Sequence, residues 1–201
     1  MIETPPSDDE LNDEKIFEAQ FAQREYFEVA GGTAEVVDVT PEKLKDEVPL
    51  FFAPAWACNI EVYKRAIETL SEQERRVISL NHPRRGGDLK ASSSEEEMKK
   101  YPEEELRKAY NILEMLDQKG VDKVDVIAHS EGAINVTIAA TLHPEKFRNI
   151  VYFAPAGLIG KDKFTRLMKG FAAQEKRAES MEDYPISEGE EETKAGEEVL
   201  E

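Results

Sequence analysis

A serine lies at the junction between a strand-like and a helix-like segment, in the stretch AHSEGA that runs from Ala128 to Ala133. So tight a turn forces its central residue into a strained backbone conformation and needs small neighbours, which Ala128 and Gly132 supply. We expect the following helix to begin at Glu131, so that its first N–H groups and its positive dipole end face whatever approaches Ser130. Those groups would stabilise an oxyanion, and the pattern therefore predicts a nucleophilic Ser130. The alternative is that Ser130 only caps the helix.

A serine nucleophile needs a base, and the base needs a carboxylate that orients it. The chain has three histidines. We expect the ring of His129, which is next to the serine, to point away from the Ser130 side chain. His143 ends a helix of about 12 residues, hence roughly 18 Å long, and is expected at the opposite edge of the sheet. His82 follows a neighbouring strand at the correct edge and is therefore the candidate base, although it precedes the serine.

Strand-like and helix-like segments alternate through the middle of the chain. Apolar runs bounded by turn residues predict strands, and apolar residues at helical spacing predict helices. This order predicts an α/β fold, in which a mostly parallel sheet has helices on both faces and follows an N-terminal β-hairpin. The expected strands lie at 24–40 (a hairpin around residues 31 and 32), 48–55, 77–80, 121–129 and 148–157, and the expected helices at 59–73, 102–120, 131–143 and 161–177.

The loops of unusual composition all follow expected strands. In open parallel sheets, sites form at the carboxyl ends of the strands. The coincidence therefore predicts a site at that edge, made by the loops at 54–59, 81–88, 129–132 and 154–160.

Three segments together resemble the first half of the α/β-hydrolase family, over about residues 24–160. VDVIAHSEGA resembles the nucleophile elbow of that family, with Ala128 in place of the usual first glycine. LFFAPAWACN resembles the exit of strand 3 and the oxyanion loop, and VISLNHPRRGGD resembles the exit of strand 4, where Arg84 departs from the usual pattern. The resemblance implies that the backbone N–H groups of Trp56 and Glu131 form an oxyanion hole. Serine at the elbow, rather than aspartate, argues against the dehalogenase and epoxide hydrolase branches.

The activity that the resemblance implies is serine hydrolysis, with transfer of the acyl group of an ester, thioester or amide to water through acyl-Ser130. In this family the acid and the histidine follow later strands, and neither Asp162 nor Asp183 ends an apolar strand here. The resemblance covers about two thirds of a typical domain of roughly 200–250 residues and omits the part that carries the base.

Three interpretations stay open. The chain is an incomplete or split form of a serine hydrolase that lacks its own acid and histidine, or a non-catalytic binding or interaction protein on the same scaffold. As a third reading, it is a minimal hydrolase that uses His82 or a histidine of a partner. The partners implied are a small acyl substrate or ligand, and a second chain that supplies the missing half or self-association that covers the edge of the last strand.

The charge of the chain is concentrated at its ends. The 43 acidic and 26 basic residues give a net charge of −17, of which residues 1–18 carry −6 and residues 175–201 carry −8. We therefore expect acidic, solvated tails around a central core. The expected division is an acidic N-terminal tail at 1–23, an α/β-hydrolase-like core at 24–160, a helix interpreted as a cap remnant at 161–178, and an acidic disordered tail at 179–201.

Composition and motifs also exclude several classes of protein. The chain has no basic stripe for a nucleic-acid partner, and no apolar stretch approaches the roughly 18 residues that span a membrane. The N-terminus lacks the features of a signal peptide, and Cys58 is the only cysteine. We expect a soluble cytoplasmic protein. Because the sequence shows no metal-ligand cluster and no phosphate-cradling glycine loop, we expect no cofactor.

Overall fold

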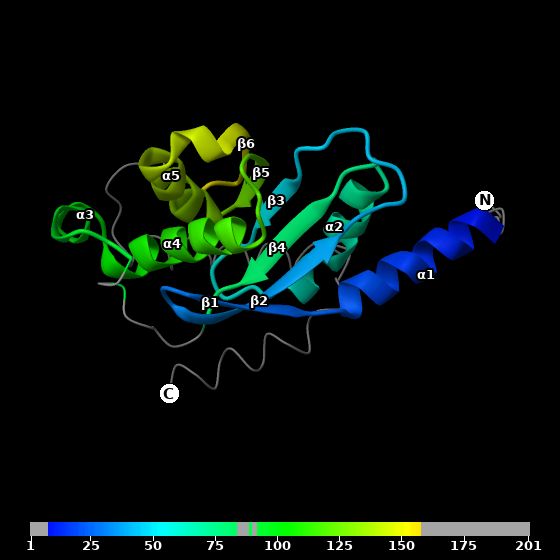
Figure 1. The fold of residues 1–201 in the computed structure, drawn as a ribbon, viewed down its shortest axis with the longest axis horizontal. Helices are drawn as coiled ribbons and strands as arrows, with labels where there is room; N and C mark the ends of the chain where they lie inside the picture. Colours follow the sequence, from blue (N-terminus) through cyan, green and yellow to red (C-terminus); the bar gives the residue numbers. More distant parts are fainter. Residues whose placement is uncertain (1–7, 84–88, 90–91, 158–201) are drawn as a thin grey trace, which may run out of the picture. The chain divides into compact units, whose positions relative to one another are not determined.

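The computed structural model describes residues 8–83, 89 and 92–157 of the 201-residue chain. In this part of the chain a six-stranded sheet has the order β1-β2-β4-β3-β5-β6 (Figure 1). β1 and β2 form an antiparallel hairpin, β2 is antiparallel to β4, and the remaining pairs are parallel. The expected fold class is confirmed. The strands are β1 (Glu25–Val29), β2 (Gly32–Val39), β3 (Leu50–Ala53), β4 (Val77–Asn81), β5 (Val124–His129) and β6 (Phe147–Phe153).

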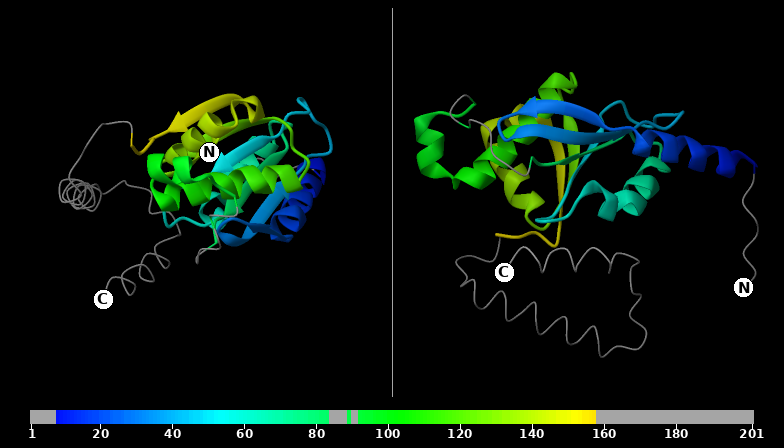
Figure 2. Two further views of the ribbon diagram at one scale, coloured as in Figure 1. Left: turned by 60° about the vertical axis from the view of Figure 1, so that its left-hand side comes forward. Right: turned by 90° about the horizontal axis from the view of Figure 1, so that it is seen from below.

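Helices cover both faces of this sheet (Figures 1 and 2). α1 and α2 pack against one face and α4 and α5 against the other, because each crossover between parallel strands must return over one face. The helices are α1 (Asp8–Ala22), the short 3-10 helix η1 (Ile60–Tyr63) with α2 (Lys64–Ser71), α3 (Glu95–Lys100), α4 (Glu103–Gln118), α5 (Gly132–Leu142) and the short 3-10 helix η3 (Pro144–Lys146).

The strands divide their side chains between two apolar cores. Successive residues of a strand point to opposite faces, so Phe51 packs under α4 and α5 whereas Phe52 packs under α1 and α2. Burial on both faces explains why the β3 sequence LFFA is apolar throughout and has all four residues buried. These two cores fix the height at which β3 and β5 end, and therefore the height of the loops that follow them.

Helix α1 differs from the expected acidic tail at 1–23. Its side chains Phe17 and Phe21 are one helical turn apart, are both buried, and pack in the core with α2. Gln20 adds a paired contact, since its side-chain amide donates to the Thr40 carbonyl at 3.0 Å and its side-chain oxygen accepts from the Thr40 amide at 2.7 Å. The expected helix at 161–178 and tail at 179–201 lie outside the described residues.

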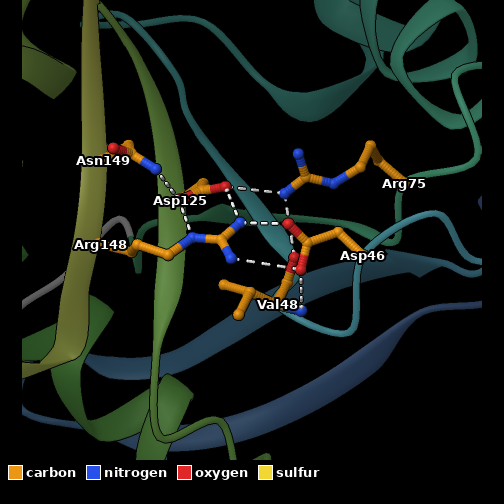
Figure 3. A network of polar contacts seen from close by, with 6 residues as sticks. All are labelled: Asp46, Val48, Arg75, Asp125, Arg148 and Asn149. Atoms are coloured by element: carbon orange, nitrogen blue, oxygen red, sulfur yellow. Dashed lines mark hydrogen bonds and ion pairs between the residues drawn. The ribbon is translucent and has the colours of Figure 1, made fainter.

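An ionic network holds the strands together at their amino-terminal edge, opposite the loops described below. Figure 3 shows Asp125 of β5 between Arg75 and Arg148, with the side-chain amide of Asn149 also donating to it. Arg148 also pairs with Asp46, in the segment that enters β3. The network therefore ties β5 and β6 to the start of β3. Its residues lie at the amino-terminal edge of the sheet and not at the carboxyl edge.

The last strand, β6, lies at the outer edge of the described sheet. Its side chains Val151 and Phe153 are largely exposed. In the described part of the chain, no helix combines the length and the apolar character needed to cross a membrane.

Candidate active site

Ser130 lies directly after β5 in a backbone conformation that few residues adopt. Its φ is +50°, in the left-handed region, where a residue with a side chain is disfavoured by roughly 1–2 kcal/mol. Hydrogen bonds hold it there. The Ser130 amide donates to the Phe153 carbonyl at 3.1 Å, and the Ser130 carbonyl accepts from the Ala156 amide at 2.9 Å and the Ala133 amide at 3.2 Å. The turn is therefore strained, as a strand-to-helix junction of this length requires.

Gly132 allows the helix after the turn to approach the neighbouring strand. A Cβ atom at this position would lie 2.6 Å from both the Ala53 and the Pro54 carbonyl oxygens, which is too close for any side chain. Ala128, on the other side of Ser130, is fully buried. The first turn of α5 therefore packs directly on the end of β3, and this contact brings the loop after β3 next to Ser130.

The start of α5 shows no sign of a serine cap. The N-cap residue of α5 is Glu131, which has a helical backbone and no side-chain capping bond. A capping serine usually has an extended backbone and accepts from an amide two or three residues on. The left-handed φ of Ser130 is unlike that arrangement.

In each of the two loops, the amide just before the proposed oxyanion-hole amide already donates a hydrogen bond within the protein. Ala55 donates its N–H to the Tyr63 hydroxyl at 3.0 Å, and Ser130 donates to Phe153 as described above. The next amide along in each loop belongs to Trp56 and to Glu131, the two residues that the sequence resemblance implies. The side chain of Trp56 is 70% exposed, so this residue is not a buried packing group.

The Glu131 side chain turns toward α4 and not into the loops. Both of its carboxylate oxygens lie 3.0 Å from Lys108 Nζ, and both side chains are mostly buried. The pair balances the charge beside Ser130 and leaves the backbone amide of Glu131 as the group that could serve a reaction.

The hydrogen bonds described for the three histidines all go to residues other than Ser130. His129 Nδ1 lies 2.8 Å from the Tyr63 hydroxyl, and burial lowers the pKa of His129. His143, at the end of α5, bonds Glu145 at 3.0 Å, as expected for a residue at the far edge of the sheet. His82 Nδ1 lies 3.3 Å from the Asn111 side-chain nitrogen.

The environment of His82 bears on its candidacy as a base. Burial, with a smaller contribution from the Lys108 charge, lowers the pKa of His82 to about 3. A group this weakly basic abstracts protons poorly at neutral pH, because catalytic efficiency follows basicity. Asn111 is itself engaged, since its side-chain oxygen accepts from the Gly31 amide at 2.7 Å. His82 in this arrangement would be a weak base.

Sequence patterns did not reveal the part that Tyr63 plays. Helical spacing places Tyr63 among apolar residues of the segment after β3, and its ring does pack against Phe52 in the core. Its hydroxyl, however, joins the amide of Ala55 to the ring of His129. Only the folded arrangement brings these residues together, because 66 positions separate Tyr63 from His129.

The free cysteine Cys58 adjoins this arrangement. It is half-buried, packs against the core with α2, lies beside the Tyr63 hydroxyl and donates its amide to the Ala55 carbonyl at 3.3 Å. Among the described residues, no group of three or more histidine, cysteine, aspartate or glutamate side chains could hold a metal ion. The loop after β4 includes residues 84–88, which lie outside the description.

Comparison with known proteins agrees with this fold. Several solved structures share the fold. A probable hydrolytic enzyme from Pseudomonas aeruginosa is 23% identical, over 72% of this chain and 44% of that one, with a TM-score of 0.53. Naproxen esterase from Bacillus subtilis is 14% identical, over 84% and 57%, with a TM-score of 0.57. A Vigna radiata epoxide hydrolase is 18% identical, over 74% and 44%, with a TM-score of 0.51.

The chain thus spans about half the length of these solved structures. A search of curated proteins found no match. The model of one protein family, described as the alpha/beta hydrolase fold, matches residues 48–184, which is more than half of the chain. The strained serine turn, the sheet order and this match lead to one conclusion: the chain belongs to the α/β-hydrolase fold family.

Proposed function

We propose that the protein is a serine hydrolase that cleaves an ester, thioester or amide through an acyl-Ser130 intermediate. The observation that carries the proposal is the left-handed turn at Ser130. Such strain persists only where the surrounding structure enforces it, and it gathers at functional sites. Here two loops and a helix terminus enforce it, at the edge of the sheet where α/β proteins place their sites.

The proposed chemistry uses Ser130 and two amides. Ser130 Oγ attacks the carbonyl carbon of the substrate and gives its proton to a base. The carbonyl oxygen becomes an oxyanion that accepts from the Trp56 and Glu131 amides, each such donor being worth roughly 100-fold to 1,000-fold in rate. The leaving group takes the proton and departs. Water, deprotonated by the same base, then releases the carboxylic acid and restores the Ser130 hydroxyl.

The base in this scheme is proposed to be a histidine of a further polypeptide segment. Among the described contacts, no hydrogen bond joins any of the three histidines to Ser130, and the bonds that they do make go to Asn111, Tyr63 and Glu145. Hydrolases with the same fold are about twice as long as the part that this chain matches. A segment that brings the acid and the histidine would complete the site.

Labelling with a fluorophosphonate, which phosphonylates activated serines, tests the proposal. The label is expected on Ser130, and added imidazole is expected to speed the reaction because it can stand in for the base. Ser130→Ala should abolish labelling, whereas Ser94→Ala, at an exposed helix cap, should not alter it. A folded protein that stays unlabelled with and without imidazole would contradict a nucleophilic Ser130.

A second candidate function is that of a non-catalytic binding or interaction protein. The one observation that favours it is that no described hydrogen bond joins a histidine to Ser130. If no base ever reaches Ser130, the same loops would still form a ligand site. The imidazole experiment separates the two proposals, since a binding protein needs no reactive serine.

A further inference from the structure

The two loops on either side of Ser130 contain no charged residue. PAWACN follows β3 at residues 54–59, and YFAPAG forms the end of β6 and its continuation at residues 152–157. Charged residues make up 34% of the chain, and they usually occupy exposed positions. The exposed residues of these two loops therefore lack the charge that is common on the rest of the surface.

Both loops expose a large aromatic side chain. Trp56 is 70% exposed and Phe153 is 62% exposed. Ala57 and Ala154, which follow them, are also exposed. Contiguous exposed apolar groups on a monomer usually mark a place where something binds.

Strand pairing puts these aromatics on opposite sides of the serine. β5 lies between β3 and β6, with Ala53 paired to Ala128 and Phe153 paired to His129. Trp56 follows the end of β3, and Phe153 is the last residue of β6. The Ser130 amide donates to the Phe153 carbonyl itself, so this strand end and the serine are in direct contact.

The charge of Glu131, the residue after Ser130, is balanced by Lys108. The Glu131 carboxylate is held by Lys108 and turned toward α4, so it offers nothing to a charged ligand. A charged group placed between the loops would lose hydration without gaining a partner from them. The surroundings of Ser130 in these two loops thus favour an uncharged, apolar ligand.

We propose that Trp56 and Phe153 bind the hydrocarbon part of an uncharged substrate, an ester or amide whose acyl or leaving group is apolar. The inference rests on the proposed function for its identification as a substrate site, but the binding itself can be measured without catalysis. The substrate's apolar group would lie between the two aromatic side chains, with its carbonyl group toward Ser130.

Trp56 provides the measurement, because it is the only tryptophan of the chain. Titration with 1-hexanol should shift the Trp56 emission to the blue as the indole leaves water. Affinity should rise with chain length from 1-butanol to 1-octanol, by up to about fourfold for each methylene group. Hexanoate and hexylammonium, which have the same chain and a charge of either sign, should each bind at least about tenfold more weakly.

Two variants locate the binding. Phe153→Ala should weaken 1-hexanol binding by at least about fivefold, because it removes one apolar wall. Tyr26→Ala is the matched control, since Tyr26 is an aromatic of similar exposure (66%) on β1, at the other edge of the sheet. The Tyr26→Ala variant should bind 1-hexanol as tightly as the unaltered protein does.

Each outcome decides between distinct alternatives. Emission that does not respond to the alcohols, or tighter binding of hexanoate or hexylammonium, would overturn the apolar site even if Ser130 is labelled. Emission already typical of a buried indole before any addition would mean that polypeptide covers the loops, which also overturns it. Alcohol binding by a protein whose Ser130 resists fluorophosphonate would support the apolar site and reject the hydrolase.

Discussion

The Tyr63 hydroxyl lies 2.8 Å from Nδ1 of His129 and accepts the amide hydrogen of Ala55 at 3.0 Å. One buried side chain thereby links the loop that carries Trp56 to the residue before Ser130. The two amides of the proposed oxyanion hole come from these two loops, so their separation depends on this link. Phe153 also packs against the His129 ring, with ring centroids 5.1 Å apart.

Tyr63→Phe should slow fluorophosphonate labelling of Ser130 by about tenfold. The ring stays in the core, but the Ala55 amide loses its acceptor and the loop is free to shift the Trp56 amide. Removing an oxyanion donor outright costs roughly 100-fold to 1,000-fold, and misplacing one should cost less. Two measurements check this. The rate of fluorophosphonate labelling reports on Ser130, and the NMR chemical shift of the His129 ring nitrogen reports directly on the lost hydrogen bond.

Tyr110→Phe is the control for this variant. The Tyr110 hydroxyl also has a hydrogen-bond partner, since it donates to Glu97 at 3.1 Å, but on the helix side away from the loops. Both variants should lose about 1 kcal/mol of unfolding free energy, the typical net worth of one hydrogen bond. Equal labelling rates for the two would show that Tyr63 has only a structural role.

Gly132→Ala should destabilise the protein by at least about 2 kcal/mol. The new Cβ would meet two backbone carbonyl oxygens at 2.6 Å, and backbone cannot move aside as a flexible side chain can. Chemical denaturation measures the loss. Thr141→Ala, at an exposed position of the same helix, should stay within about 0.5 kcal/mol of the unaltered protein. A fully stable Gly132→Ala variant would mean that α5 does not pack on the end of β3 as described.

The strands and the serine turn could be predicted from sequence because their signals are local. An apolar run, a small-residue pentad around Ser130 and a following apolar helix suffice to place that turn. Helix α1 was missed because its contribution is two phenylalanines within a strongly acidic segment, and charge dominates the composition there. The hydroxyl of Tyr63 was missed for a different reason: its partners come from other elements, and no spacing within the chain encodes them.

Ser130→Gly should raise the free energy of unfolding by about 1 kcal/mol relative to Ser130→Ala. At a φ of +50° alanine keeps the clash of its Cβ with the backbone, whereas glycine has none. Both variants lose the hydroxyl, so the comparison isolates backbone strain from any reaction. The greater flexibility of glycine in the unfolded chain acts in the opposite direction and makes this a lower bound on the strain. Equal stability of the two variants would show that the turn relaxes out of the left-handed region.

Asp125→Asn should destabilise the protein by about 2 kcal/mol at pH 7, since it leaves two guanidinium groups without their shared carboxylate. Hydrogen bonds from Arg148 and Arg75 hold the pKa of Asp125 well below its usual range, against the opposing effect of burial. The carboxylate therefore stabilises the fold above the unfolded pKa of about 3.9, and this stability is lost as pH falls below that value. The difference between the two proteins, measured by denaturation, should accordingly shrink below about pH 4. Asp117→Asn, which removes a largely exposed carboxylate that pairs with Lys146, should cost less than about 0.5 kcal/mol at either pH. A difference for Asp125→Asn that does not change with pH would contradict the depressed pKa.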